Sequence, residues 1–313
     1  MVMSCPSQTP RLRAGLALIA AFLAVVAPGV AAQTLEPRSY SNVPVGMNFL
    51  IAGYAYITGG VVTDAAVAPE NTDVQAHEAF LGYARGIDVW GNSGKIDVIL
   101  PYAWVSGSAA LNGQRQERNV TGLGDPKLRI SANFFGAPAL APEEFAGYQQ
   151  DVIIGASLQV TVPVGQYDPD KLVNIGTNRW TVKPELGISK ALGPLILEVA
   201  ASASFFSDND DFLGGHTRTQ NSLYAVQGHA IYNFESGIWI AIDGTYYSGG
   251  ETSVDGVAND DMQSNTRVGL TMALPVDRNN SVKLNVSSGV SARTGSDFDL
   301  IGIAWQYRWG AGL

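Results

Sequence analysis

The chain has 313 residues, a formal net charge of −9, 35 glycines and a single cysteine, Cys5. An acidic balance argues against nucleic acid as a partner, because phosphates require a basic surface. One cysteine excludes a disulfide-stapled scaffold. Glycine is abundant and helix-period stretches are scarce, so one large β-structure is the fold class that the composition favours.

The first 32 residues have the pattern of a secretory signal peptide. Arg11 and Arg13 supply the positive region, and Ala14 to Val26 form an apolar stretch of 13 residues. This stretch is too short to span a bilayer, which needs about 20 residues. Small residues at Val30-Ala31-Ala32 then offer a cleavage site. We therefore expect a cleaved signal peptide at 1–32, an N-terminal periplasmic segment at 33–46 and a folded domain at 47–313.

The sequence predicts twelve β-strands: two weakly patterned segments come first, and ten segments then alternate apolar and polar residues with a period of two. The last is the clearest: odd positions from Ile301 to Trp309 are large and apolar, and even positions from Gly302 to Arg308 are small or polar. The first is apolar on both faces. The predicted strands cover 47–58, 78–85, 95–104, 127–134, 151–162, 180–189, 195–205, 224–234, 238–246, 267–274, 281–290 and 297–309.

The connections between the predicted strands, and the two rows of side chains that alternate along each strand, favour a membrane barrel over a soluble sandwich. Predicted connections alternate between short and long, as in barrels with tight periplasmic turns and longer outer loops. The apolar rows carry almost no charge, as lipid requires, whereas the polar rows are mostly Ser, Thr, Asn, Gln and Gly. We predict an all-β fold, an up-and-down antiparallel transmembrane β-barrel of about twelve strands in the outer membrane. Ile301, Ile303, Trp305, Tyr307 and Trp309 should face lipid, and Gln306 and Arg308 the lumen.

Eight charged residues fall on rows predicted to face the lumen: Lys127, Arg129, Lys183, Glu185, Glu198, Asp243, Arg267 and Lys283. A hairpin turn centred between Ala191 and Leu192 would place Glu185 opposite Glu198, an unfavourable like-charge pair. Lys183 or Arg129 could offset that repulsion. The charges could constrict the lumen and filter passengers, or they could simply pair and fill a narrow barrel.

Three aromatic residues are also predicted to point inward: Phe206, Trp239 and Tyr247. Their rings could stack against an aromatic solute. They could equally fill space between the strands.

Three short glycine-containing motifs give the chain a family resemblance. They are Gly122-Leu123-Gly124-Asp125-Pro126, Val162-Pro163-Val164-Gly165-Gln166-Tyr167, and the run from Asn174 to Trp180 followed by Lys183-Pro184. In these motifs the chain resembles the outer-membrane proteins encoded with meta-cleavage phenol degradation, and the likeness covers about residues 45–313. The resemblance implies an outer-membrane transporter for aromatic compounds. Its motif residues here are Gly122, Gly124, Asp125, Pro163, Gly165 and Tyr167; Val164 and Pro126 depart from the family pattern and leave the cargo open.

The residues by themselves give the first motif a structural role. Gly122 and Gly124 supply backbone freedom at a loop-to-strand junction, and Asp125 can accept hydrogen bonds from nearby amides. The sharper alternative, a phosphate cradle, requires a following helix. The sequence predicts none there.

Enzyme signatures are absent from the predicted mature chain. His77, His216 and His229 show no metal-ligand spacing, and spacing cannot establish the Ser-His pair that a membrane-embedded hydrolase would need. His229 lies on an inward row, where it could serve a proton-linked role or be a satisfied lumen histidine. The acidic stretches 208–211 and 255–261 could hold calcium or bridge lipopolysaccharide, or be solvated loops. We predict no enzyme activity, no cofactor and no metal.

The function that the sequence favours is passive uptake of a small solute, an aromatic one on the resemblance. The alternative is a non-transporting structural or surface barrel. The expected partners are outer-membrane lipid, the barrel assembly machinery and a small-molecule solute, without nucleic acid. A continuous open lumen would favour uptake, whereas a lumen sealed by paired charges would favour the structural role.

Overall fold

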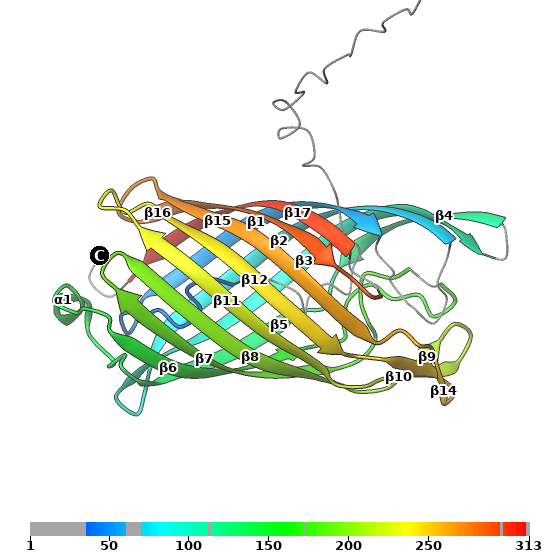
Figure 1. Cartoon of the computed structure of the whole chain (residues 1–313), viewed down its shortest axis with the longest axis horizontal. Helices are drawn as coiled ribbons and strands as arrows, with labels where there is room; N and C mark the ends of the chain where they lie inside the picture. Colours follow the sequence, from blue (N-terminus) through cyan, green and yellow to red (C-terminus); the bar gives the residue numbers. More distant parts are fainter. Residues whose placement is uncertain (1–35, 61–69, 112–113, 172, 295–296, 311–313) are drawn as a thin grey trace, which may run out of the picture.

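The computed structural model describes residues 36–60, 70–111, 114–171, 173–294 and 297–310, so the predicted signal peptide at 1–32 lies outside it. Within these ranges twelve antiparallel strands form a barrel and confirm the predicted fold (Figure 1). None of the helices in the described part is long and apolar enough to span a membrane. The barrel strands are β1 (Asn48–Gly60), β2 (Glu70–Val89), β3 (Asn92–Leu111), β5 (Lys127–Phe135), β6 (Val152–Thr161), β7 (Thr181–Leu192), β8 (Leu195–Phe206), β11 (Leu223–Asn233), β12 (Trp239–Gly249), β15 (Gln263–Pro275), β16 (Asn280–Ser291) and β17 (Asp297–Trp309).

The sheet closes through its first and last strands. β1 pairs with β17 from Asn48 opposite Trp309 to Gly60 opposite Asp297, and its other edge pairs with β2. β2 in turn pairs with β3, and β3 with β5. Closure satisfies the backbone groups of strand edges that hydrocarbon cannot solvate.

The two ends of the barrel differ as the loop lengths predict. One end carries short connections, such as Gly193-Pro194 between β7 and β8, together with the short helix α1 (Pro142–Phe145). The other end, at the right of Figure 1, carries the extensions of β2 and β3 with β4 (Gln114–Leu123). A small second sheet adds to it, built from β9 (Asn209–Phe212), β10 (His216–Gln220), β13 (Thr252–Val254) and β14 (Val257–Ala258).

β2 is longer than the eight residues predicted for it, because its outer part pairs with β3 beyond the barrel. The pairing with β3 runs from Glu70 to Val89, and the residues outside 78–85 carry no clean alternation that would mark them as strand in the sequence.

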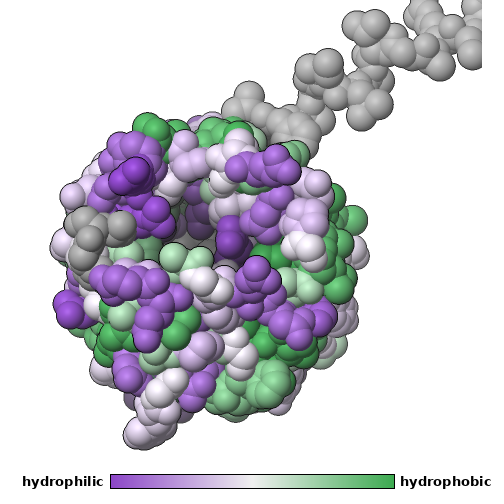
Figure 2. Space-filling model, turned by 90° about the vertical axis from the view of Figure 1, so that its left-hand side faces the viewer, coloured by the Kyte–Doolittle hydropathy of each residue, from purple (hydrophilic) through white to green (hydrophobic). Residues whose placement is uncertain are grey.

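On most strands the predicted lipid-facing row is the more exposed one; at the end of β17, however, Tyr307 and Trp309 are half-buried and Arg308 is exposed. On β7, Leu186 is 61% exposed and its neighbour Glu185 only 7%. On β17, Ile301, Ile303 and Trp305 are exposed, and Gln306 lines the lumen cavity. The Arg308 side chain donates to the carbonyl of Arg278 at the next turn. Figure 2 looks onto the short-turn end, where polar residues surround a central hollow.

Residues 36–46, the described part of the predicted periplasmic segment, fold into the barrel from its short-turn end. The Gly46 amide donates to the Gly86 carbonyl at 2.9 Å at the rim. Deeper in, the ring of Tyr40, 3% exposed, lies against Gly155 and Gly187. A Cβ at Gly187 would lie 2.0 Å from that ring. The sequence predicts a periplasmic segment at 33–46; its described part contacts the inside of the barrel, where the two glycines leave room for the Tyr40 ring.

Candidate functional site

A cavity of about 530 Å³ occupies the lumen. Its lining comes from residues 36–43, from most of the barrel strands and from the connection 162–180 at the long-loop end. This volume falls within the usual range of small-molecule sites. The two parts of its lining differ in chemistry.

Strands β1, β2 and β3 provide an apolar wall, which we define as Phe49, Ile51, Ile57, Phe80, Ile99 and Pro101. The ring of Phe80 lies across Gly53, where a Cβ would be only 2.2 Å from the Phe80 Cζ atom. The predicted strand 47–58 is apolar on both faces for this reason: one face contacts lipid and the other contacts the cavity.

The rest of the lining is polar and carries an excess of positive charge. Seven basic and four acidic residues line the cavity, which leaves three positive charges in excess inside a chain whose net charge is −9. The basic residues are Arg38, Lys95, Lys127, Arg129, Arg179, Lys183 and Lys283, and the acidic ones are Glu36, Glu78, Asp97 and Asp125.

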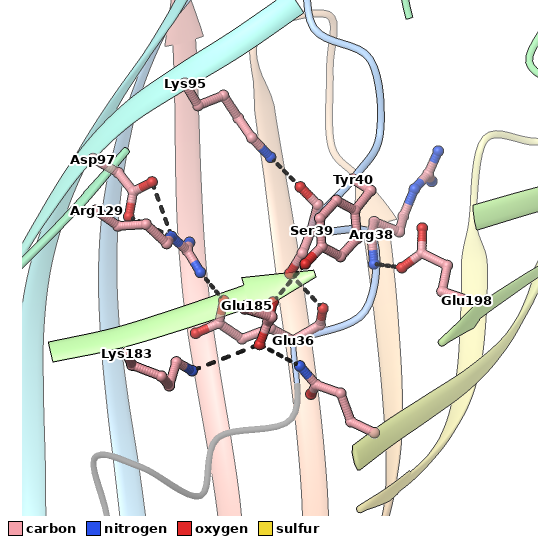
Figure 3. Close-up of polar contacts among 11 residues, drawn as sticks. Glu36, Arg38, Ser39, Tyr40, Lys95, Asp97, Arg129, Lys183, Glu185 and Glu198 are labelled. Carbon is pink, nitrogen blue, oxygen red and sulfur yellow. Dashed lines mark hydrogen bonds and ion pairs between the residues drawn. The ribbon is translucent and has the colours of Figure 1, made fainter. Parts of the chain in front are cut away.

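Glu36 binds inside this polar part (Figure 3). The Arg129 Nη1 group donates to Glu36 Oε2, and its Nε group donates to both carboxylate oxygens of Asp97 at 3.1 Å. Lys95 Nζ donates to the Ser39 carbonyl at 2.6 Å. Burial on its own would raise the pKa of Glu36, but the positive charges of Arg129 and its neighbours hold this pKa well below its ordinary value.

The structure separates Glu185 from Glu198 and so corrects the predicted pair. The β7–β8 turn is Gly193-Pro194, two residues beyond the predicted centre, and it places Glu185 opposite Ser202 and Glu198 opposite Ser189. A two-residue hairpin loop favours glycine at a position with positive φ, and Gly193 has a φ of 62°. The chain turns where glycine allows it.

Each of these carboxylates holds the N-terminal segment. Tyr40 Oη donates to Glu185 Oε1 at 2.8 Å, and Gln227 Nε2 donates to the other oxygen at 3.0 Å. The backbone amide of Arg38 donates to Glu198 Oε2 at 2.8 Å. The predicted compensation of Glu198 by Lys183 is absent from these described contacts: Lys183 lies 3.8 Å from Glu185. Both acids anchor the segment and neither lines the cavity.

The other charged candidates divide between cavity and wall. Lys127, Arg129, Lys183 and Lys283 line the cavity. Asp243 is buried beside His229 Nδ1 at 2.6 Å and accepts a hydrogen bond from Thr271 at 2.8 Å. Arg267 is fully buried, with its guanidinium 3.2 Å from the Phe298 ring centroid. Asp243 and Arg267 therefore belong to the barrel wall.

One of the three aromatic candidates lines the cavity. Phe206 contributes to the lining, and the Arg179 guanidinium lies 4.7 Å from its ring centroid. Trp239 lies beneath Arg38 at 5.3 Å, outside the cavity lining. Tyr247 is 1% exposed and fills the wall. A stacking role thus concerns Phe206 alone among the three.

The family motif residues meet at the long-loop end, where Asp125 fastens the connection 162–180. Its carboxylate accepts hydrogen bonds from the Gly165 amide at 2.8 Å, and from the Thr177 amide and hydroxyl, both at 2.7 Å. Gly165 lies so close to Asp125 and Gly176 that a Cβ would be 2.8 Å from the Asp125 amide nitrogen. This fastening places Ile175, Thr177 and Arg179 in the cavity lining.

The other motif residues surround that contact. Gly122 and Gly124 allow Gln166, Pro101 and Ile175 to approach closely. Pro163 lies in the same connection, and the Tyr167 hydroxyl donates to the Asp211 carbonyl at 3.0 Å. The structural role predicted for the first motif agrees with these contacts.

Sequence reasoning missed the N-terminal segment and the apolar wall. Residues 36–46 have no periodicity that could place them inside a barrel. Lys95 and Asp97 do lie on the polar row of a predicted strand, and the doubly apolar strand 47–58 was a usable signal for an apolar lumen wall.

The acidic loops use several carboxylates in local contacts. Asp255 binds His216 Nδ1 at 2.6 Å, and Asp261 accepts a hydrogen bond from the Thr252 amide at 2.6 Å. Across the described ranges, no group of three or more His, Cys, Asp or Glu side chains could hold a metal ion.

Comparison with a protein-family model decides the family. Residues 58–307 match the family described as "Putative MetA-pathway of phenol degradation". The chain belongs to this family. The resemblance drawn from the glycine motifs is therefore confirmed, and so is the outer-membrane location of the barrel. No curated protein sequence matches the chain.

Solved structures support the fold. An outer membrane channel from Pseudomonas putida F1 is 21% identical, with a TM-score of 0.74 over 88% of this chain and 100% of that one. The transport unit of the autotransporter AIDA-I from Escherichia coli is 8% identical, with a TM-score of 0.50 over 89% and 94% of the two chains. At these identities the likeness shows the barrel fold.

Proposed function

We propose that this family member is a channel for passive uptake of a small solute with an aromatic or similarly apolar body. The observation that carries the proposal is the lumen cavity, in which the apolar wall lies beside charged and polar groups. The description of the family refers to phenol degradation, and the similar barrel of Pseudomonas putida F1 is described as a channel. Both descriptions support the proposal.

The physical basis is partial desolvation inside the lumen. An aromatic ring that packs against Phe49, Ile51 and Phe80 removes apolar surface from water. This burial favours binding by about 25 cal/mol per Å² of apolar surface. The polar groups elsewhere in the lining keep the rest of the solute hydrated or hydrogen-bonded. Binding of this modest strength lets a solute enter and also leave, as conduction requires.

Swelling of liposomes tests the proposal. Liposomes with the protein should swell faster in iso-osmotic sodium benzoate than empty liposomes, and faster than in sodium gluconate, because the gluconate ion has no apolar body. We expect Ile51→Asn to slow swelling in benzoate several-fold. Val257→Asn, on the exposed strand β14 outside the barrel, is the matched control. Equal swelling with and without the protein would refute the channel function.

A non-transporting structural barrel is the second candidate, and the N-terminal segment favours it. Residues 36–46 cross into the lumen and bind Arg129, Glu185, Glu198 and Lys95. If this segment seals the barrel permanently, the same liposomes will not swell in any solute. The absence of enzyme activity and the assembly machinery as a partner stay predictions under either function.

A further inference from the structure

Positive charges of the lumen gather around one carboxylate. Glu36 accepts a hydrogen bond from Arg129, and the charges of Lys183 and Lys283 also favour its ionised form. Figure 3 shows Glu36 inside the lumen among Arg129, Lys183 and Glu185. We call Arg129, Lys183 and Lys283 the basic cluster. Its occupant belongs to the N-terminal segment and not to the barrel wall.

The positive charges around the basic cluster can bind a further anion besides the Glu36 carboxylate. Lys283 lines the cavity and is exposed to it. No carboxylate of the described residues forms a salt bridge with Lys283 or with the nearby Lys127. At longer range Glu36 acts on both, Glu78 on Lys127 and Asp243 on Lys283. Two ammonium groups that face the same cavity without a salt bridge favour an anionic partner. An incoming anion can supply it.

The basic cluster adjoins the apolar wall. Register places Lys283 opposite Ala304, Ala304 opposite Gly53, and Gly53 opposite Phe80. The strands of Lys283 and Phe80 are thus roughly 14 Å apart, with three inter-strand spacings between them. Ala304 and Gly53 lie between them on this row, and the Phe80 ring itself lies across Gly53. A solute ring can lie against Phe80 with its anionic group toward Lys283.

We propose that the basic cluster is a carboxylate-binding subsite, which Glu36 occupies in this structure and which a small apolar carboxylate fills by displacing Glu36. A carboxylate is favoured over other anions because the present occupant is one, and because Arg129 offers a planar guanidinium of matching geometry. The apolar wall then selects carboxylates that carry a ring or a short alkyl chain. The inference rests on the proposed channel function and names its solute class.

Displacement of Glu36 also links binding to the position of the N-terminal segment. Once Glu36 leaves Arg129, the segment keeps the bonds of Arg38 to Glu198 and of Tyr40 to Glu185. The carboxylate of Glu36 then leaves the basic cluster, while the Glu36 carbonyl still accepts a hydrogen bond from Ser39 and residues 38–46 stay anchored. The solute thus competes with a part of the protein for the same charges.

Binding to the detergent-solubilised full mature chain tests this without requiring transport. In ligand-observed NMR titrations, benzoate should bind more tightly than benzyl alcohol, which lacks the charge, and than inorganic phosphate, which lacks the ring. Glu36→Gln should tighten benzoate binding about tenfold by removing the internal competitor. Lys283→Gln should weaken it about tenfold, whereas Lys283→Arg should keep it within about threefold, because the charge remains.

The matched controls lie outside the lumen. Glu235→Gln, at an exposed turn, and Lys190→Gln, whose partner is Asp151 at the short-turn end, should leave benzoate binding unchanged. Heat-modifiable mobility on gels will verify that each variant is folded. Equal affinity for benzoate and benzyl alcohol, or an unchanged affinity in Glu36→Gln, would overturn the subsite. If benzoate binds as expected while liposomes do not swell, the channel function fails and the subsite stands.

Discussion

Replacement of Asp125 by alanine should release the connection 162–180 from the barrel mouth. The Asp125 carboxylate is 7% exposed and accepts three hydrogen bonds from Gly165 and Thr177. Hydrogen bonds to a charged acceptor contribute about 1.5–3 kcal/mol each. They share one carboxylate and are not additive, so we expect local opening to become easier by about 3 kcal/mol, equal to about 100-fold.

Amide hydrogen exchange in detergent micelles measures this directly. The Gly165 and Thr177 amides should exchange about 100-fold faster in the Asp125→Ala variant, while amides of the barrel strands keep their protection. Asp170→Ala, an exposed carboxylate in the same connection, is the control and should change neither. Unchanged exchange at both amides in Asp125→Ala would refute the argument that this carboxylate holds the connection in place.

Three further predictions probe the barrel surface, the segment and the apolar wall. Leu186→Arg, on the lipid-facing row, should destabilise the folded barrel by about 2–4 kcal/mol in urea titrations, against about 0–1 kcal/mol for Leu192→Arg at the short turn; equal losses would contradict the assigned lipid face. Tyr40→Phe removes the hydroxyl bond to Glu185, so single-channel recordings should show more frequent openings, and an unchanged open fraction would mean that this bond does not hold the segment. Gly53→Ala should push the Phe80 ring into the cavity and reduce single-channel conductance, whereas wild-type conductance would show that the ring has room to move aside.

The number of barrel strands and the direction of their side chains followed from the sequence. Lipid outside and a crowded lumen inside impose opposite requirements on alternate residues, so a period of two appears in segments such as 297–309. Leu186 and Glu185 were placed on opposite faces by that pattern alone. The charged rows and the glycine motifs also indicated which residues belong to the lumen and to the family.

The partners of the lumen charges were not predictable from the sequence. Glu185 and Glu198 were paired on an assumed turn, and the two-residue shift to Gly193-Pro194 gave each a different neighbour. Periodicity reports a face but not a register, because register depends on where the turn falls.

The sequence by itself determined the barrel, because most strands have lipid on one face and a polar lumen on the other. Only the tertiary structure decided the contents of the lumen. Residues 36–46 carry no pattern, and they enter the lumen because distant glycines leave room for Tyr40 and distant charges receive Glu36. The cavity between this segment, the apolar wall and the basic cluster exists only where chain segments far apart in the sequence meet.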